Sequence, residues 1–197
     1  MKHRVTRAPR LELEQAGLRL AVGVVVLVVL LLRLISQSKP SAELSQMVWF
    51  LAGFVAFAVA ITLWILAGPQ VSATRRILGI VADNATITWF MLHMGESGAL
   101  VVGIYMFVAF GNAFRFGPSY LRISQGAALV GFAFVLFVSD FWSNHVSIGV
   151  GLFVALLILP LYVGLLMQRL NQARLDAEQA LRECLEQRER LSRPWGI

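Results

Sequence analysis

Residues 47–67 read MVWFLAGFVAFAVAITLWILA, an apolar run that contains no charged side chain. A helix needs about 20 such residues to cross about 30 Å of hydrocarbon, so this run is long enough for one membrane span. Across the whole chain 58% of the residues are hydrophobic and 14% are charged, which is more apolar surface than a soluble domain of 197 residues can bury. The sequence therefore predicts an integral membrane protein.

Similar runs divide most of the chain into six predicted spans, at residues 18–35, 47–67, 77–94, 98–114, 120–138 and 146–167. The apolar residues are continuous and do not alternate with polar ones, which favours helices over the strands of a membrane barrel. We expect an all-α, polytopic helical membrane protein with about six transmembrane helices and a cytoplasmic exit helix. Its regions are a basic N-terminal segment (1–17), a membrane domain (18–167) and a helical tail (168–197).

The positions of the basic residues predict the orientation in the membrane. With six spans, both termini lie on one side, together with every Lys and Arg except Arg33 and Lys39. Basic residues collect on the cytoplasmic side of membrane proteins, so both termini are expected in the cytoplasm. Five spans would place the basic N-terminus opposite the basic C-terminus, which the same rule disfavours.

The composition argues against several classes of function. Membrane orientation explains the net charge of +6, and no nucleic-acid partner is expected because no basic face with base-stacking groups is recognisable. The single Cys184 excludes a disulfide framework, and three separated histidines suggest neither a metal site nor another cofactor. No catalytic residue is assigned and no enzyme is predicted, because no nucleophile with a partner base stands out.

Asp83 is the most unusual residue of the predicted spans. It lies roughly 9 Å into the span at 77–94, where an ionised side chain needs a partner. His93 falls on the same side of that helix and Glu96 lies just beyond its end, so these residues predict a ligand-sensing or proton-sensitive polar path. The alternative is a structural bond from Asp83 to Asn112 or Arg115, which are themselves candidates for the sensing site.

Other charged or helix-bending residues are candidates for binding or coupling. Arg33, near the outer end of the first span, either anchors that helix at the interface or offers a cation to the head of an anionic amphiphile. Glu14 and Arg19 lie at the entry to the same span and are candidates for signal coupling. Pro160 is expected to bend the last span, either as a hinge or as ordinary packing.

The charged tail has a heptad pattern. Apolar or small residues recur at alternating intervals of four and three, among them Leu170, Ala177 and Cys184. This spacing predicts a short coiled coil that couples the membrane domain to another helix or to a second copy of the chain. The alternative is a solvated helix in which the heptads are incidental.

Several short motifs occur in a defined order along residues 18–175: Arg75-Arg76, Ala82-Asp83, Leu92-His93, Gly95-Glu96, a predicted loop at 111–117 (GNAFRFG) followed by Tyr120-Leu121, and Leu159-Pro160-Leu161-Tyr162. Together they resemble the membrane input domain of RpfC-type sensor histidine kinases. Those proteins are bacterial receptors of the diffusible signal factor, so the resemblance implies a medium-chain unsaturated fatty acid as ligand. The family usually has Gly where Ala113 stands and often Tyr where Phe116 stands.

The chain differs from that family after the exit helix. No histidine follows His145, and the chain ends at Ile197, so we expect neither a phosphoacceptor nor a kinase domain, as in a kinase-less relative of the input domain. A truncated receptor is the alternative. The resemblance implies a non-catalytic sensory or modulatory role in a quorum-sensing two-component pathway that regulates virulence. The implied partners are the lipid membrane, the fatty acid, and a receptor histidine kinase or a second copy.

A different class of function remains open from the residues alone. A small transporter or channel for a proton or small acid could place Asp83, His93 and Glu96 along its conduction path. That reading predicts flux that is lost in Asp83→Asn, whereas the sensory reading predicts binding or association without flux.

Overall fold

The computed structural model describes residues 7–39, 41–68 and 70–192, and every regular element within these ranges is a helix. In chain order the elements are α2 (Arg7–Ser36), α3 (Ala42–Ala67), α4 (Ala73–His93), the 3-10 helix η1 (Gly95–Ser97), α5 (Gly98–Phe116), α6 (Pro118–Val138), α7 (Asp140–Asn144) and α8 (Val146–Ser192). The predicted all-α fold is confirmed. The expectation about how the chain ends falls on residues 193–197, outside the described ranges.

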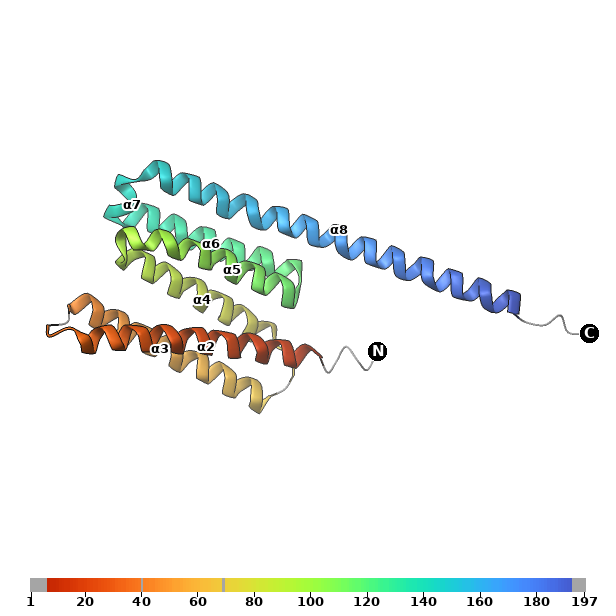
Figure 1. Ribbon diagram of the computed structural model, residues 1–197, viewed down its shortest axis with the longest axis horizontal. Coiled ribbons are helices and arrows are strands. Elements are labelled where there is room, and N and C mark those ends of the chain that lie inside the picture. The colour runs from red at the N-terminus through yellow and green to blue at the C-terminus, as the bar shows by residue number, and fades with distance from the viewer. Residues whose placement is uncertain (1–6, 40, 69, 193–197) are drawn as a thin grey trace, which may run out of the picture.

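The long helices run in alternating directions, so both ends of the described chain lie at one end of the bundle, here called the termini end (Figure 1). The hairpin of α2 and α3 lies along one side, and α8 lies on the opposite side and continues past the termini end (Figure 1). Between them, α4, α5 and α6 pack against one another. The architecture is an antiparallel helical bundle with one protruding helix.

Membrane crossing is supported for five helices, which are long and apolar enough to span a bilayer: Leu11–Ser36, Ala42–Ala67, Gly98–Phe116, Pro118–Val138 and Val146–Arg188. The polytopic helical membrane class is thereby confirmed. α4 is not among the five, although it has the same 21-residue length as α6, because charged and amide side chains such as Asp83 and Asn84 lower its hydropathy. The sixth span, through α4, stays a prediction. It agrees with the direction of α4, which runs opposite to α3 and α5 (Figure 1).

Two predicted boundaries differ from the structure. α2 begins at Arg7, well before the predicted start at residue 18, so much of the N-terminal segment is helical. The loop predicted at 111–117 is wrong, because α5 continues to Phe116. Only Gly117 forms the turn: its φ of 95° suits glycine, and Pro118 then starts α6. The last span leads directly into the exit helix, and the two form one continuous helix, α8.

Serines fix where two of the membrane helices begin. The Ser41 side chain accepts a hydrogen bond from the backbone N–H of Leu44 at 3.1 Å, which caps α3. Ser72 caps α4 in the same way through the N–H of Arg75. Each cap satisfies one of the free N–H groups at a helix start.

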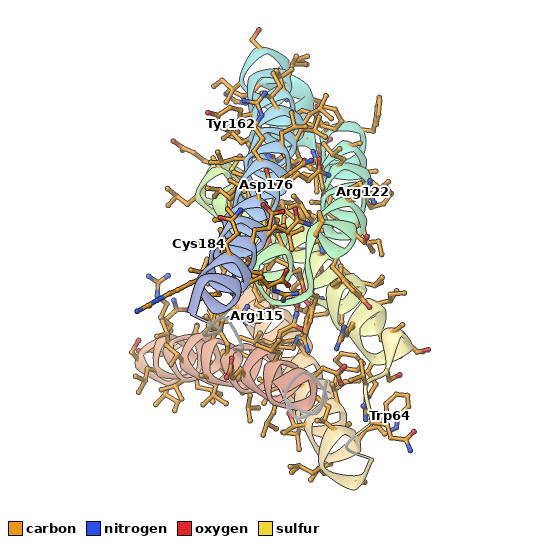
Figure 2. All side chains as sticks on the ribbon, turned by 90° about the vertical axis from the view of Figure 1, so that its right-hand side faces the viewer. Trp64, Arg115, Arg122, Tyr162, Asp176 and Cys184 are labelled. Carbon is orange, nitrogen blue, oxygen red and sulfur yellow. The ribbon has the colours of Figure 1, made fainter. Side chains whose placement is uncertain are left out.

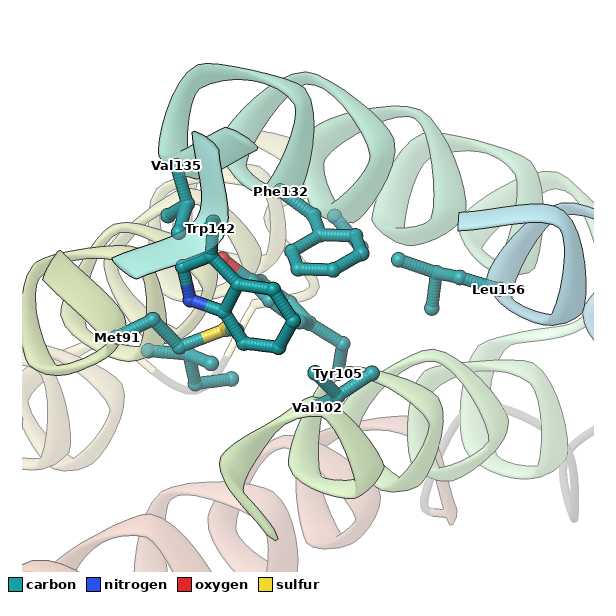
Figure 3. Close-up of a cluster of buried hydrophobic side chains, with 9 residues drawn as sticks. Met91, Val102, Tyr105, Phe132, Val135, Trp142 and Leu156 are labelled. Atoms are coloured by element: carbon teal, nitrogen blue, oxygen red, sulfur yellow. The ribbon is translucent and has the colours of Figure 1, made fainter. Parts of the chain in front are cut away.

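The hydrophobic core lies between α4, α5, α6, α7 and α8 (Figure 3). Tyr105 of α5 and Phe132 of α6 are fully buried there, and Trp142 of the short α7 stacks edge-on against Phe132 at 5.5 Å between ring centroids. The Tyr105 hydroxyl also lies 2.6 Å from the Thr88 hydroxyl, which joins α4 to α5. This core holds α4 to α8 together independently of the α2–α3 hairpin.

The hairpin of α2 and α3 packs mainly on itself. The face of α2 that turns away from lipid carries Glu12, Ala16, Arg19 and Gly23, all buried and spaced at intervals of four and three. Two of these four residues are charged. Glu12 and Arg19 join α2 to α4 through ion pairs, which help to build the site described next, while Phe50 of α3 stacks on Trp89 of α4.

The tail of α8 is solvated in the described chain. The side chains of Ala177 and Cys184 are exposed, and Leu170 is 62% exposed. An intrahelical ion pair joins Arg174 and Glu178 one turn apart. The predicted coiled-coil pairing of this helix stays a prediction.

Candidate ligand-binding groove

A cavity of about 300 Å³ separates the α2–α3 hairpin from α4 and α5. The α2 wall is one stripe of the helix, with Leu18, Val22, Val26 and Leu30 repeating every four residues. The opposite wall on α5 includes Val101, Ile104, Phe107 and Val108. Met47, Leu51 and Phe54 of α3 and Phe90 of α4 add further apolar surface. The cavity is a predominantly apolar groove, of the size that small-molecule sites have.

The charged and amide residues of the groove gather toward the termini end. They are Gln15 and Arg19 in the first half of α2, Asp83 in α4, and Asn112 and Arg115 in the last turns of α5. Gln15 donates from Nε2 to Oδ1 of Asn112 at 2.7 Å and so bridges the two walls. The groove is therefore amphipathic along its length, with charges and amides at one end and hydrocarbon at the other.

Arg19 and Asp83 form a two-pronged ion pair in this polar end. Arg19 donates from Nε to Oδ1 at 2.5 Å and from Nη2 to Oδ2 at 2.8 Å, and the two side chains are 6% and 13% exposed. Gly79, one turn before Asp83, leaves room for the guanidinium, because an added Cβ would meet Arg19 Nη2 at 2.5 Å. Two parallel charge-assisted hydrogen bonds hold α2 against α4 at this point.

The inward-facing role of Asp83 agrees with its predicted position, but the predicted bond to Asn112 or Arg115 is wrong. Arg19, which was a candidate for coupling only, supplies the partner instead. The two residues are 64 positions apart, and only the packing of α2 against α4 brings them together. Asn112 and Arg115 do lie in the same groove.

A second buried ion cluster lies beside the groove. Glu12 accepts from Nη2 of Arg75 at 3.2 Å, from Nε of Arg76 at 2.8 Å and from the backbone N–H of Ser72 at 3.3 Å. Arg75 also donates to the backbone carbonyls of Trp64, in the last turn of α3, and of Gly68 and Gln70, in the α3–α4 connection. The cluster attaches α2 to the start of α4.

Glu12 was missed by the sequence reasoning, which chose Glu14. The structure buries Glu12 and leaves Glu14 exposed. The signal that could have found it is the spacing of Glu12, Ala16 and Arg19, which places a carboxylate and a guanidinium on one helix face with a small residue between them.

The other predicted sensing residues lie away from the polar end. His93 is exposed at the far end of α4, where its ring stacks on Trp89 at 4.2 Å and its Nδ1 lies 2.8 Å from the Trp89 carbonyl oxygen. Glu96 is exposed in η1, and Arg33 is exposed near the far end of α2. Ten residues of helix, about 15 Å, separate His93 from Asp83. The three residues Asp83, His93 and Glu96 therefore do not form a continuous path.

One predicted coupling residue has a defined environment. Pro160 is fully buried within α8, where its missing N–H interrupts the helical hydrogen bonding. Close to it, Gln125 of α6 donates to the carbonyl oxygen of Leu157 at 2.7 Å. This contact ties the irregular turn of α8 to the bundle.

Metal binding finds no support in the described residues, because no three His, Cys, Asp or Glu side chains among them are grouped closely enough to hold an ion.

Comparison with known proteins gives a similarity to the Sensory/regulatory protein RpfC of Xanthomonas campestris pv. campestris, from strain ATCC 33913 and from strain 8004. Each match is 29% identical over 130 residues and covers 66% of this chain. The chain corresponds to only 18% of the length of those relatives. No family model and no solved structure matches. The resemblance to RpfC that the motifs predict is confirmed, and it supports a sensory role.

Proposed function

We propose that this chain is a non-catalytic sensory or modulatory protein of a quorum-sensing two-component pathway, and that it binds a medium-chain unsaturated fatty acid of the diffusible-signal-factor class. The amphipathic groove between the α2–α3 hairpin and α4–α5 carries the proposal. The similarity to a sensory/regulatory protein supports the sensory role. The proposed location is a bacterial inner membrane, with both termini in the cytoplasm.

The shape and lining of the groove suit a single acyl chain. From Gln15 to Leu30 the α2 wall rises by about 22 Å, at 1.5 Å per residue. Beyond Arg19 that wall is lined by Val22, Gly23, Val26 and Leu30, and the charged and amide residues stand at one end. Burial of a hydrocarbon chain provides most of the binding free energy in such a site, and a few polar groups fix its orientation.

A route from the groove to the exit helix runs through the packing of the bundle. α5 forms one wall of the groove and also packs against α6 and α8. Occupation of the groove would push the hairpin and α5 apart, and α8 would change its angle near Pro160. We propose that the exposed tail of α8 then pairs differently with the matching helix of a receptor kinase or with a second copy of this chain.

The test is a groove-blocking substitution. Ile104 lies in the α5 wall, so Ile104→Trp fills the groove, whereas Val130 is 72% exposed on α6 and lies outside it. We expect the purified chain in lipid nanodiscs to bind a medium-chain cis-unsaturated fatty acid, Ile104→Trp to weaken binding by tenfold or more, and Val130→Trp to leave it unchanged. Equal binding by both variants would overturn the proposal.

A second candidate function is transport of a proton or small acid, because the Arg19–Asp83 pair lies within the groove at the depth of a membrane span. It predicts flux through proteoliposomes that contain the wild-type chain and loss of flux in Asp83→Asn. Flux with that behaviour would replace the sensory proposal.

A further inference from the structure

We infer that the groove binds its ligand head-first toward the termini end, with the carboxylate on Arg115 and Gln15 and the hydrocarbon tail pointing to the far end. The inference rests on the proposed function and assigns the head group within the same groove. It differs from the sequence-based expectation, in which an outward-facing cation at Arg33 would receive the head.

Arg115 is the cation of the groove whose charge is not matched. The salt bridges between described residues pair Arg19 with Asp83 and leave Arg115 without a carboxylate. Among the described residues, its one side-chain hydrogen bond is a 3.2 Å contact from Nη1 to the Gly111 carbonyl of its own helix. A guanidinium carries five N–H donors, so most of those on Arg115 remain available to an anion.

The charges that line the groove sum to one positive charge, from Arg19, Asp83 and Arg115. One monovalent anion neutralises that charge. In Figure 2, which views the termini end, Arg115 lies between α2 and the rest of the bundle, whereas Arg122 lies at the outer edge of α6. The position and the charge of Arg115 both favour a single carboxylate at this end.

Gln15 supplies a second contact from the opposite wall. Its Nε2 donates one hydrogen to Asn112, and the second hydrogen of that amide is free to point at an anion beside Arg115. The Asn112 amide nitrogen donates one hydrogen to the Val108 carbonyl at 2.7 Å, and its second hydrogen is available in the same way from the α5 wall. A carboxylate bound here therefore touches α5 through Arg115 and α2 through Gln15, which joins the two walls that the tail separates.

The far end of the groove offers no comparable partner. Its lining is apolar, with Leu30, Met47, Phe90, Met94 and Val101. Arg33 and Lys39 are exposed and are not part of the lining. With both termini in the cytoplasm, as proposed, the head of the ligand lies at the depth of the inner leaflet, so an external signal must cross the bilayer before it binds.

The test compares the free fatty acid with its methyl ester, which has the same tail and no charge. The full chain in nanodiscs is expected to bind the acid more tightly than the ester by about tenfold, the factor of one charge-assisted hydrogen bond. Arg115→Gln should abolish that preference and leave the Kd for the ester unchanged, which also reports an intact fold. Arg115→Lys should restore part of the preference.

Two matched variants complete the design. Arg122→Gln removes an exposed arginine outside the groove and should keep the preference for the acid. A preference that is kept in Arg115→Gln and lost in Arg33→Gln would overturn the inference and place the head at the far end. If acid and ester bind equally well, and Ile104→Trp weakens the binding of both, the ligand lies in the groove but its head is not held by Arg115. That result would refute the head assignment alone. If neither the acid nor the ester binds, the proposed function itself is refuted. This is the result expected when a bilayer lipid or a helix of a second copy fills the groove.

Discussion

The ion pair between Arg19 and Asp83 should be a strong link between the α2–α3 hairpin and the rest of the bundle. Asp83→Asn removes the charge of one partner and leaves the Arg19 guanidinium nearly buried at span depth. Removing one partner of a buried pair costs about 3–5 kcal/mol. An unpaired charge near the centre of a membrane helix costs about 3 kcal/mol on insertion scales. We therefore expect Asp83→Asn to lower the unfolding free energy by about 3 kcal/mol.

A double-mutant cycle separates the pair from other effects of the substitution. Arg19→Gln and Asp83→Asn should each destabilise the protein, and the double variant should be less destabilised than the sum of the two by about 2 kcal/mol or more. Reversible denaturation in mixed micelles measures the four free energies. The matched control is Glu178→Gln in the exposed pair with Arg174, whose side chains are 48% and 79% exposed; its expected cost is at most about 0.5 kcal/mol.

The reasoning fails if the effects of Arg19→Gln and Asp83→Asn are additive, because additivity means that the two charges do not interact. It also fails if Asp83→Asn costs no more than Glu178→Gln, since the pair would then behave as a solvated surface contact.

Three other substitutions have defined outcomes. Glu12→Gln removes the carboxylate that two arginines share and should lower the unfolding free energy by about 3 kcal/mol. Glu14→Gln on the exposed face should change the unfolding free energy by less than about 0.5 kcal/mol, and equal effects of the two substitutions would refute the placement of α2. Gly79→Ala introduces a Cβ against the paired guanidinium and should lower the unfolding free energy by about 1.5 kcal/mol, although alanine has the better helix propensity. Gly103 has open space around it, so Gly103→Ala should raise the unfolding free energy. Changes of the same sign in the two variants would contradict the prediction. Gln125→Leu removes the donor to the carbonyl near Pro160, so spin labels on α6 and the α8 tail should show a broader distance distribution, and an unchanged distribution would exclude this contact as a constraint on the exit helix.

Much of the fold could be predicted from the sequence, because membrane helices are encoded locally. Apolar runs marked the long helices, five of them long and apolar enough to span a membrane, and their order is that of the antiparallel bundle. The ends were less well predicted. Arg7 starts α2 well inside a segment rich in charges, and α5 continues to Phe116 because the single positive φ needed for the turn occurs at Gly117.

The site was predicted in part. An aspartate at span depth, such as Asp83, requires a partner, and this requirement is visible in one helix taken alone. The identity of the partner is not, because it depends on how α2 packs against α4. Asp83 could have paired with any nearby donor, and the structure selects Arg19, while Glu12 takes Arg75 and Arg76. The groove itself arises between two helix pairs and has no sequence motif of its own.

The most direct measurement of the central claim is a cross-linking map of the bound ligand. A medium-chain unsaturated fatty acid with a photoreactive diazirine in its tail is irradiated with the full chain in native membranes, with and without excess unlabelled acid, and the modified residues are identified by mass spectrometry. We predict adducts on the groove walls, at residues such as Val26 and Ile104, that the unlabelled acid suppresses. Adducts spread over the lipid-facing surfaces of α6 and α8, and insensitive to competition, would contradict a ligand site in the groove.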